Sequence, residues 1–485
     1  MTQPAGPATP NSPSAPPGSA ARHDLSTKAG IRACLEQALA LHRQGRIGPA
    51  YELYKSIVAA DPAQFDAFHM MGVVLNQANQ NEHALPLFER ALALKPTSPE
   101  AHYNRALALQ SLGRLDAAIA GYRKALELKP DYASAATNLG NSLRNSNRLD
   151  EALAAYDLSL RLRPAHAGTE VNRALCLLKR GDYPEGFAQY EARWRDAISV
   201  RQAGLESRPG RLWLGREDLA GKTILLYAEQ GLGDTLQFCR YAALVAARGA
   251  RVWLEAHKRL LPLLQSLAGV ERLIESGTTG PAADFHCPLM SLPLACGTTL
   301  ANVPAAPAYL HADAARNAAW AARLGPRTGN RPRVGLVWSG GPDHKEDGNR
   351  SMRLDRLLPF LPDHCDYVSL QKDLRPDDAA VLAQRPDIRH YGPEQNDFAD
   401  AAALCAQMDV VISVDTSVAH LAAATGRPTW VLLAFSPDWR WLLNRDDSVW
   451  YPTVRLFRQR ALGDWSAPLA AVQAALAGLP ARPAP

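Results

Sequence analysis

The pattern of apolar and polar positions changes about two fifths of the way along the chain. Up to about residue 195, small, aromatic and apolar residues return at a fixed interval of 34 positions. After that point, apolar runs of strand length alternate with helix-like segments. The sequence therefore predicts a repeated helical array followed by α/β structure.

Four residue types define the repeat, each at one position of a 34-residue period. An alanine, an aromatic, a proline and in three cases a glycine recur in register. They are Ala50, Ala84, Ala118 and Ala152; Tyr54, Phe88, Tyr122, Tyr156 and Tyr190; Pro62, Pro96, Pro130 and Pro164; and Gly45, Gly113 and Gly181.

This period resembles the tetratricopeptide repeat, a pair of helices. Small alanines let the two helices approach, the aromatic fills the gap to the next helix, glycine makes the turn and proline ends the second helix. Four repeats span about residues 29–164. A fifth, residues 165–196, lacks the closing proline, which is typical of a capping or docking unit. We assign residues 29–200 to the repeat domain.

The second part of the chain predicts parallel sheets, because strands alternate with helices. A segment with proline and glycine, residues 325–332, separates two such blocks. We expect Rossmann-like α/β units at 205–315 and 330–477, facing each other, with ligands at the carboxyl ends of the strands. The expected strands are 222–229, 250–256, 270–276, 333–340, 366–371, 409–415 and 428–434.

The first strand leads into a turn, Gly231-Leu232-Gly233-Asp234, that begins like a dinucleotide-binding loop. The third glycine of that fingerprint is absent, since Leu236 takes its place, and the Asp234 charge is ill suited to a pyrophosphate. Two roles remain for Asp234. It caps a helix starting at Thr235, which the spacing favours, or it accepts a proton.

A phosphate site is predicted further along, where strand 409–415 runs into a helix. Asp415, Thr416 and Ser417 precede His420 there, so hydroxyls and free N–H groups stand at a helix start. The alternative is that the first three residues are caps and that His420 packs in the core.

Loops after other strands supply weaker candidates for donor binding. Ser339 and Gly340 end one strand, and Arg350 or Lys345 would balance phosphate charge. Gln371 and Lys372 follow the next strand as possible donor contacts.

Two motifs together, GLGD and SVDTSVAHLAAATGRP, resemble glycosyltransferase family nine, the heptosyltransferase-like group, over about residues 210–460. With its repeats, the whole chain resembles bacterial relatives of O-linked N-acetylglucosamine transferase and SPINDLY. The resemblance implies a GT-B fold, Asp234 as catalytic base, and donor binding at Asp415, Thr416, Ser417 and His420. Ser417 stands where typical members have glycine, and no catalytic histidine motif of the O-linked transferases is found.

One column of the repeats carries asparagine. Asn104, Asn138 and Asn172 stand on the first helices of successive repeats. First helices line the inner groove, and an amide can pair with the backbone of an extended peptide. The O-linked transferases have an asparagine ladder similar to this one. The alternative is that these are exposed polar positions of a consensus repeat.

The amino-acid composition limits the partners, cofactors and cellular location to be expected. A net charge of +5 without a long basic run does not favour nucleic acid as a binding partner. Seven scattered cysteines without a Cys-x-x-Cys pair indicate reduced thiols in the cytoplasm and no zinc site. Residues 1–28 and 478–485 are typical of loose tails, with no signal peptide and no membrane span. The chain lacks an Asp-x-Asp pair, so we expect no metal and no cofactor.

These observations favour a glycosyltransferase that uses a nucleotide-sugar donor and recruits a protein or peptide acceptor through its repeats. Two alternatives stay open. The acceptor is a glycan or lipid-linked saccharide, or the chain is a repeat scaffold whose transferase part has lost catalysis.

Overall fold

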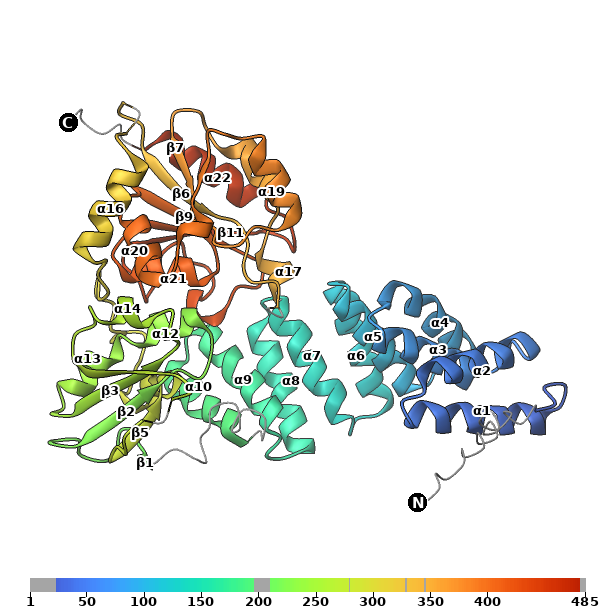
Figure 1. Cartoon of the computed structure of the whole chain (residues 1–485). Coiled ribbons are helices and arrows are strands. Elements are labelled where there is room, and N and C mark those ends of the chain that lie inside the picture. Colours follow the sequence, from blue (N-terminus) through green and yellow to red (C-terminus); the bar gives the residue numbers. More distant parts are fainter. Residues whose placement is uncertain (1–22, 196–209, 279, 328, 344–345, 480–485) are drawn as a thin grey trace, which may run out of the picture. The chain divides into compact units, whose positions relative to one another are not determined.

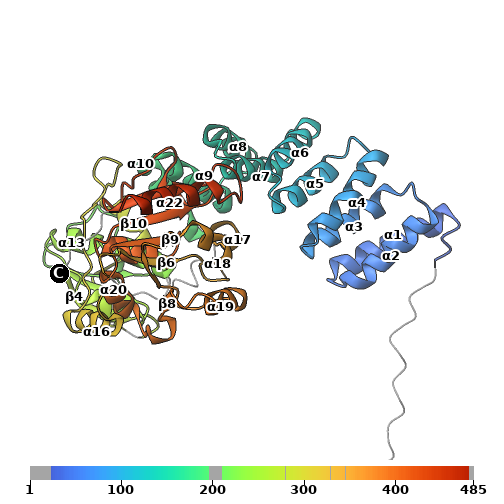
Figure 2. The same cartoon turned by 90° about the horizontal axis from the view of Figure 1, so that it is seen from above.

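A computed structural model describes residues 23–195, 210–278, 280–327, 329–343 and 346–479 (Figures 1 and 2). The chain forms two compact units, Met1–Pro130 and Asp131–Pro485. Most of each predicted tail lies outside the described residues.

The described part of the first unit consists of three helix pairs. The alanine and aromatic columns of the repeat are fully buried in it, at Ala50, Ala84 and Ala118 and at Tyr54, Phe88 and Tyr122. The helices are α1 (Lys28–Arg43), α2 (Ile47–Ala60), α3 (Phe65–Gln77), α4 (Asn81–Leu94), α5 (Pro99–Ser111) and α6 (Leu115–Leu128).

The turn inside each helix pair requires a left-handed residue. Gly45, Gly113 and Gly181 have φ of +74°, +72° and +100°, and Asn79 and Asn147 take the same place with φ of +57° and +60°. Asparagine tolerates this conformation better than other side chains. The 34-residue glycine column is therefore a conformational requirement that asparagine also meets.

The second unit begins with two more helix pairs. They are α7 (Ala133–Asn145) with α8 (Leu149–Leu162), and α9 (Ala167–Arg180) with α10 (Tyr183–Tyr190), followed by the 3₁₀ turn η1 (Glu191–Arg195). Leu178, Tyr183 and Phe187 of the last pair share one hydrophobic core with the α/β residues that follow. The fifth repeat thus docks onto the α/β part, as its missing proline indicated.

The first α/β half contains a five-stranded parallel sheet in the order β1-β5-β2-β3-β4. Its strands are β1 (Arg211–Leu212), β2 (Thr223–Tyr227), β3 (Arg251–Ala256), β4 (Val270–Glu275) and β5 (Phe285–Pro288). Its described helices are α12 (Leu232–Phe238), α13 (Tyr241–Ala246), α14 (Leu261–Leu264), η3 (Leu289–Ser291) and α15 (Leu292–Ala295).

The second half contains a six-stranded parallel sheet in the order β11-β10-β9-β6-β7-β8. The strands are β6 (Arg333–Val337), β7 (Asp366–Ser369), β8 (Arg389–His390), β9 (Val410–Val414), β10 (Thr429–Leu433) and β11 (Val454–Arg458). The helices are α16 (Ala314–Leu324), α17 (Asp347–Arg350), α18 (Leu354–Leu357), η4 (Leu358–Phe360), α19 (Pro376–Ala383), η5 (Gly392–Glu394), α20 (Phe398–Ala406), α21 (Ser417–Ala424), η6 (Trp439–Trp441) and α22 (Ser466–Ala477).

Alternate residues of β9 point to opposite faces of this second sheet. Val410, Ile412 and Val414 share a core with α18 and α22, whereas Val411 shares a core with α20 and α21 (Figure 1). Helices therefore cover both faces, which explains why all of strand 410–414 is buried and why it consists of valine and isoleucine apart from Ser413.

The predicted fold class is confirmed. Consecutive helix pairs precede two parallel, Rossmann-like sheets, as in a GT-B fold. In the described part of the chain, every helix is too short or too polar to cross a membrane.

Candidate active site

Asp234 lies in the first turn of α12, three residues after the turn glycine that precedes the helix. Its Oδ2 accepts a hydrogen bond of 2.8 Å from the backbone N–H of Gly231. This bond satisfies one of the amides left free near a helix start. The capping role favoured by the spacing is therefore present, with the helix starting at Leu232 rather than at Thr235.

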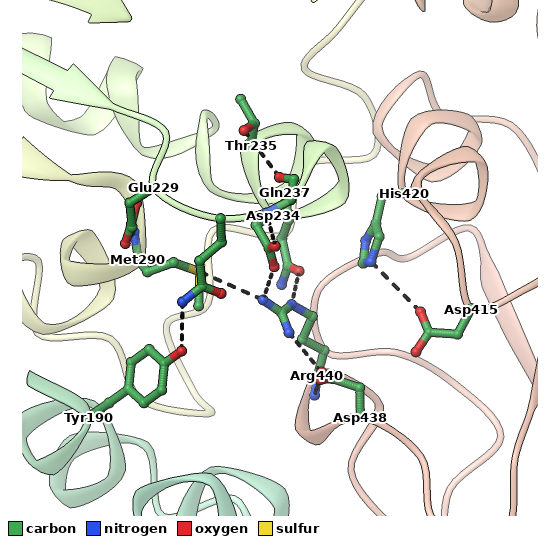
Figure 3. Close-up of polar contacts among 12 residues, drawn as sticks. Tyr190, Glu229, Asp234, Thr235, Gln237, Met290, Asp415, His420, Asp438 and Arg440 are labelled. Atoms are coloured by element: carbon green, nitrogen blue, oxygen red, sulfur yellow. Dashed lines mark hydrogen bonds and ion pairs between the residues drawn. The ribbon is translucent and has the colours of Figure 1, made fainter. Parts of the chain in front are cut away.

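The other oxygen of Asp234 faces the second half of the fold. Its Oδ1 accepts from Nη2 of Arg440, in η6 (Figure 3). The same guanidinium donates to Oε1 of Gln237 at 2.7 Å and to Oδ1 of Asp438 at 2.8 Å. Asp234 is therefore held from both sides, by its own helix and by the partner half.

Arg440 is a functional residue that the sequence reasoning missed. Its side chain is 8% exposed, and that of Asp234 is 24% exposed. Burial by itself would lower the pKa of Arg440, but the charges of Asp438 and Asp234 outweigh burial and raise it. Arg440 thus stays cationic and orients the carboxylate of Asp234 through a charge-assisted hydrogen bond.

The predicted phosphate motif follows β9 and opens α21. Asp415 directly follows the strand, Thr416 is the N-cap residue, and Ser417 is the first residue of the helix. Thr416 is 7% exposed and its hydroxyl lies 3.2 Å from that of Ser413. The motif therefore presents a helix start at the carboxyl edge of the sheet.

His420 lies one turn into α21 and is 6% exposed. Its Nε2 is 3.9 Å from Oδ1 of Asp415 (Figure 3). Its Nδ1 is 2.9 Å from the hydroxyl of Tyr451, and its ring stacks on Trp441. Burial, followed by the charge of Arg440, lowers the pKa of His420 to about 3. His420 is therefore neutral at physiological pH, and it both packs and hydrogen-bonds.

Asp415 has an opposite shift. Burial and then the charge of Asp438 raise the pKa of Asp415 to about 6. The carboxylate is ionised at neutral pH, but it gains its proton in mild acid.

The two sequence motifs meet in space. A Cβ placed on Gly233 would lie only 3.0 Å from Cδ2 of His420 and 3.6 Å from Cα of Ser417. The absence of a side chain at Gly233 thus permits the close approach of α12 to α21. Gly231 has an extended backbone with φ of −66°, so its role is in the turn rather than in a left-handed conformation.

Arg350 also reaches this edge of the second sheet. Its Nη1 donates to the backbone carbonyl of Asp415 at 2.9 Å, and its guanidinium fills the space beside Gly340. Ser339 exchanges hydrogen bonds with Gln371, at 3.4 and 3.0 Å. The structure therefore joins these loops beside Asp415.

Lys372, a predicted donor contact, makes its hydrogen bonds elsewhere. Lys372 donates to the backbone carbonyls of Gly392 and Gln395, at 3.0 and 2.6 Å, and so fixes the η5 loop. Lys345 lies outside the described residues.

A buried network supports the loop that carries Asp234. Oε1 of Glu229 accepts from Met290 N at 3.2 Å and from Nη2 of Arg193 at 3.3 Å, and Gln230 donates to the hydroxyl of Tyr190 at 2.7 Å. Burial raises the pKa of Glu229 to about 7 despite the Arg193 charge. Since Arg193 and Tyr190 belong to η1 and α10, the fifth repeat holds the loop in place.

The asparagine column lies on first helices, as predicted. Nδ2 of Asn104, in α5, is 2.8 Å from Nε2 of His69. Asn138, in α7, accepts from Asn141 at 3.3 Å, and Asn172 lies half-buried on α9. Asn104 belongs to one compact unit and the other two to the second. Their peptide-binding role stays a prediction.

A cavity of about 620 Å³ opens at the opposite edge of the second sheet. Arg331, Asp366 and Asp387, at the amino ends of β6, β7 and β8, contribute to its lining. The candidate site lies at the carboxyl ends of the strands, where parallel sheets usually bind ligands. It is therefore separate from this cavity. Among the residues described, no group of three His, Cys, Asp or Glu side chains is placed to hold a metal ion.

Comparison with known families gives independent matches. Residues 72–113, 99–132 and 137–200 match tetratricopeptide-repeat models, and residues 395–441 match glycosyltransferase family 9 (heptosyltransferase). The chain combines tetratricopeptide repeats with a glycosyltransferase family 9 segment. This segment includes Asp415, Thr416, Ser417, His420 and Arg440, whereas Asp234 lies outside it.

Among curated proteins, Protein FlbA of Caulobacter vibrioides (strain ATCC 19089 / CIP 103742 / CB 15) is 29% identical over 332 residues. The match covers 62% of this chain and 53% of FlbA, so the chain spans about half the length of this relative. Solved structures include MamA, at 20% identity over 35% of this chain and 93% of that chain, with a TM-score of 0.32. YrrB, described as a TPR protein with an unusual peptide-binding site, matches at 19% identity over 36% and 90%, with a TM-score of 0.32.

Proposed function

We propose that the chain is a glycosyltransferase that moves a sugar from a nucleotide-sugar donor to an acceptor hydroxyl. The family 9 match supports the transferase class. The observation that carries the site is the contact of the two motifs, in which the Gly233–Asp234 turn lies against His420 and Asp234 pairs with Arg440.

The proposed reaction divides between the two halves. The acceptor oxygen attacks the anomeric carbon of the donor, and the nucleoside diphosphate leaves. The acceptor proton passes to the carboxylate of Asp234, which Arg440 orients. Charge that develops on the diphosphate is stabilised by the N–H groups at the start of α21 and by Arg350. We expect this chemistry to need no metal.

The repeats supply the proposed acceptor specificity. Their helix pairs support binding of a protein or peptide, with Asn104, Asn138 and Asn172 as the proposed groove contacts. A cytoplasmic location stays a prediction from the cysteine pattern.

The experiment is a transfer assay with a panel of nucleotide sugars that carry a labelled sugar. Label found on protein or peptide acceptors supports the full proposal. Label found only on saccharides supports the glycosyltransferase activity but contradicts a protein or peptide acceptor. No turnover of any donor, under conditions in which a known transferase works, contradicts the proposal.

A further inference from the structure

Lys179, on helix α9 of the repeats, is buried against the second α/β half. Its side chain is 4% exposed, and its Nζ donates to Oγ of Ser436 at 2.8 Å. An ammonium has three N–H donors. Within the described residues, the hydrogen bond to Ser436 uses one of them, so this buried cation has donors to spare.

Both basic and acidic side chains act on Lys179. Arg144 of α7 and Arg458 of β11 are its cationic neighbours, and Asp438 is its acidic neighbour, with the Cys176 thiol on its own helix. Asp438, however, is already paired with Arg440 at 2.8 Å. Arg458 donates to three backbone carbonyls, at 2.6 to 3.0 Å. Arg144 and Arg458 therefore disfavour the charged form of Lys179, Asp438 favours it, and Asp446 acts in the same sense on Arg458.

The pKa of Lys179 reflects first its burial and then its charged neighbours. Burial, followed by the Arg144 cation, lowers the pKa of Lys179 to about 7. An anion in contact with the ammonium would stabilise its charged form. The site thus favours a ligand that brings negative charge with it.

The position of Ser436 points to the donor side of the fold. Ser436 follows β10, which lies next to β9, the strand that directly precedes Asp415. Asp438 influences the pKa of Asp415 as well as that of Lys179. Lys179 is therefore close to the same carboxyl edge of the sheet.

The loop beneath Lys179 is fixed by neighbouring side chains. Asn147, from the turn after α7, donates to the carbonyl of Phe435 at 2.7 Å, and Gln459 accepts from the N–H of Phe435 at 3.1 Å. Gln459 is 5% exposed, and within the described residues its buried Nε2 has no acceptor. A second buried donor without an acceptor thus belongs to the residue that holds Phe435, the neighbour of Ser436 in the chain.

We propose that Lys179 and Arg144 bind the phosphate groups of the donor, so that the repeat helices complete the donor site. The ligand class is a nucleoside diphosphate, and its identification as part of a sugar donor rests on the function proposed above. The alternative is that Lys179 only docks the repeats onto the α/β half.

The test uses the full chain and isothermal titration calorimetry with inorganic pyrophosphate, UDP, GDP and ADP. Lys179→Met and Arg144→Gln remove the charges, and Lys179→Arg keeps one. Asn147→Gly removes a docking hydrogen bond without removing charge, and glycine accepts the left-handed backbone. We expect Lys179→Met to weaken binding about ten- to hundredfold, the scale of a hydrogen bond to a charged group. Lys179→Arg should bind more tightly than Lys179→Met, and Asn147→Gly should bind like the wild type.

The number of protons taken up when the ligand binds distinguishes anion binding by Lys179 from a purely structural role in docking the repeats. Titrations at pH 8 in buffers of different ionisation enthalpy should show nearly one proton taken up by the wild type, because Lys179 is mostly neutral before the anion binds. Lys179→Met should lose this proton, a change that a purely structural contact would not cause.

The outcomes distinguish the two proposals. Pyrophosphate binding that depends on Lys179, without binding of any nucleotide, supports the anion site and contradicts the donor function. Nucleotide binding that is equal in the wild type and Lys179→Met supports the donor function and overturns the role of Lys179. No binding of any phosphate compound to the wild type overturns the anion site.

Discussion

Arg440 pairs with Asp234 across 206 positions of sequence and so links the two α/β halves at the candidate site. Without this pair, the turn after β2 would carry only a capping carboxylate. With it, the same carboxylate is also oriented toward the second half by a buried guanidinium.

Asp234→Asn should abolish the proton acceptor and leave the fold intact. We expect transfer to fall by about 100-fold or more, the usual scale of lost acid–base help, with donor affinity near that of the wild type. Steady-state kinetics and donor titration check both. Asp397→Asn is the matched control, since Asp397 also caps a helix and pairs with an arginine, Arg316. Equal turnover in the two variants would remove Asp234 from the mechanism.

Arg440→Met should destabilise the second unit strongly. It leaves Asp234 and Asp438 facing each other without their cation, and losing one partner of a buried ion pair costs about 3–5 kcal/mol. Arg445→Met is the control, because the Arg445–Asp447 pair lies at the surface, where a pair contributes about 1 kcal/mol or less. Urea unfolding measures both, and similar losses would show that Arg440 is not the link described here.

Gly233→Ala should be unfavourable although alanine is the better helix former. The added Cβ meets the His420 ring, which is held between Tyr451 and Trp441, and such overpacking costs about 1–3 kcal/mol. Gly48→Ala, in α2 with open space around it, should instead gain up to about 1 kcal/mol. A gain at both positions in urea unfolding would contradict the close contact of α12 with α21.

His420 should make the protein sensitive to acid. Its pKa is lowered in the folded state, so the unfolded chain takes up a proton first, and stability is lost as pH falls below about 6.5. Between pH 7.5 and 5.5 the wild type should lose about 1.4 kcal/mol more than His420→Gln. Asp415 has the opposite sign, since its raised pKa adds stability as pH falls through about 6, but it acts in both proteins. A wild type and variant that lose equal stability would mean that His420 titrates normally.

Replacing Asn104, Asn138 and Asn172 together by alanine should raise the Michaelis constant of a protein or peptide acceptor. The donor's Michaelis constant is the internal control and should not change, because these residues lie outside the donor motifs. Steady-state kinetics with each substrate varied in turn measures both. Equal effects on the two constants would contradict a peptide groove.

Local sequence was enough to predict the repeats and most of the strands. The glycine column marked the left-handed turns, and the apolar runs marked β2, β3, β4, β6, β7, β9 and β10. It was not enough for β5, which lies in an uncharged stretch with prolines, for β11, which carries two arginines, or for the two-residue strands β1 and β8. Those strands form because a neighbouring strand completes their hydrogen bonds, and no local pattern records that.

The residues of the candidate site also fall into those that local sequence predicted and those that it did not. Asp234 and the Asp415–His420 motif stand at strand-to-helix turns, where local chemistry indicates a role. Arg440 lies in a short turn whose partner is 206 residues away, and Lys179 reaches the second half from a helix whose own pattern marks it only as part of a repeat. Both depend on how the halves and the fifth repeat pack together.

The central claim is that the Asp415–His420 edge binds a nucleotide-sugar donor. The most direct measurement is the melting temperature of the purified protein with a panel of nucleoside diphosphates and nucleotide sugars, with and without EDTA. A ligand that binds only the native state raises the melting temperature. We predict a shift for one nucleotide family that EDTA does not remove and that Thr416→Ala with His420→Ala abolishes. No shift with any member of a panel that works on a control enzyme would contradict the claim.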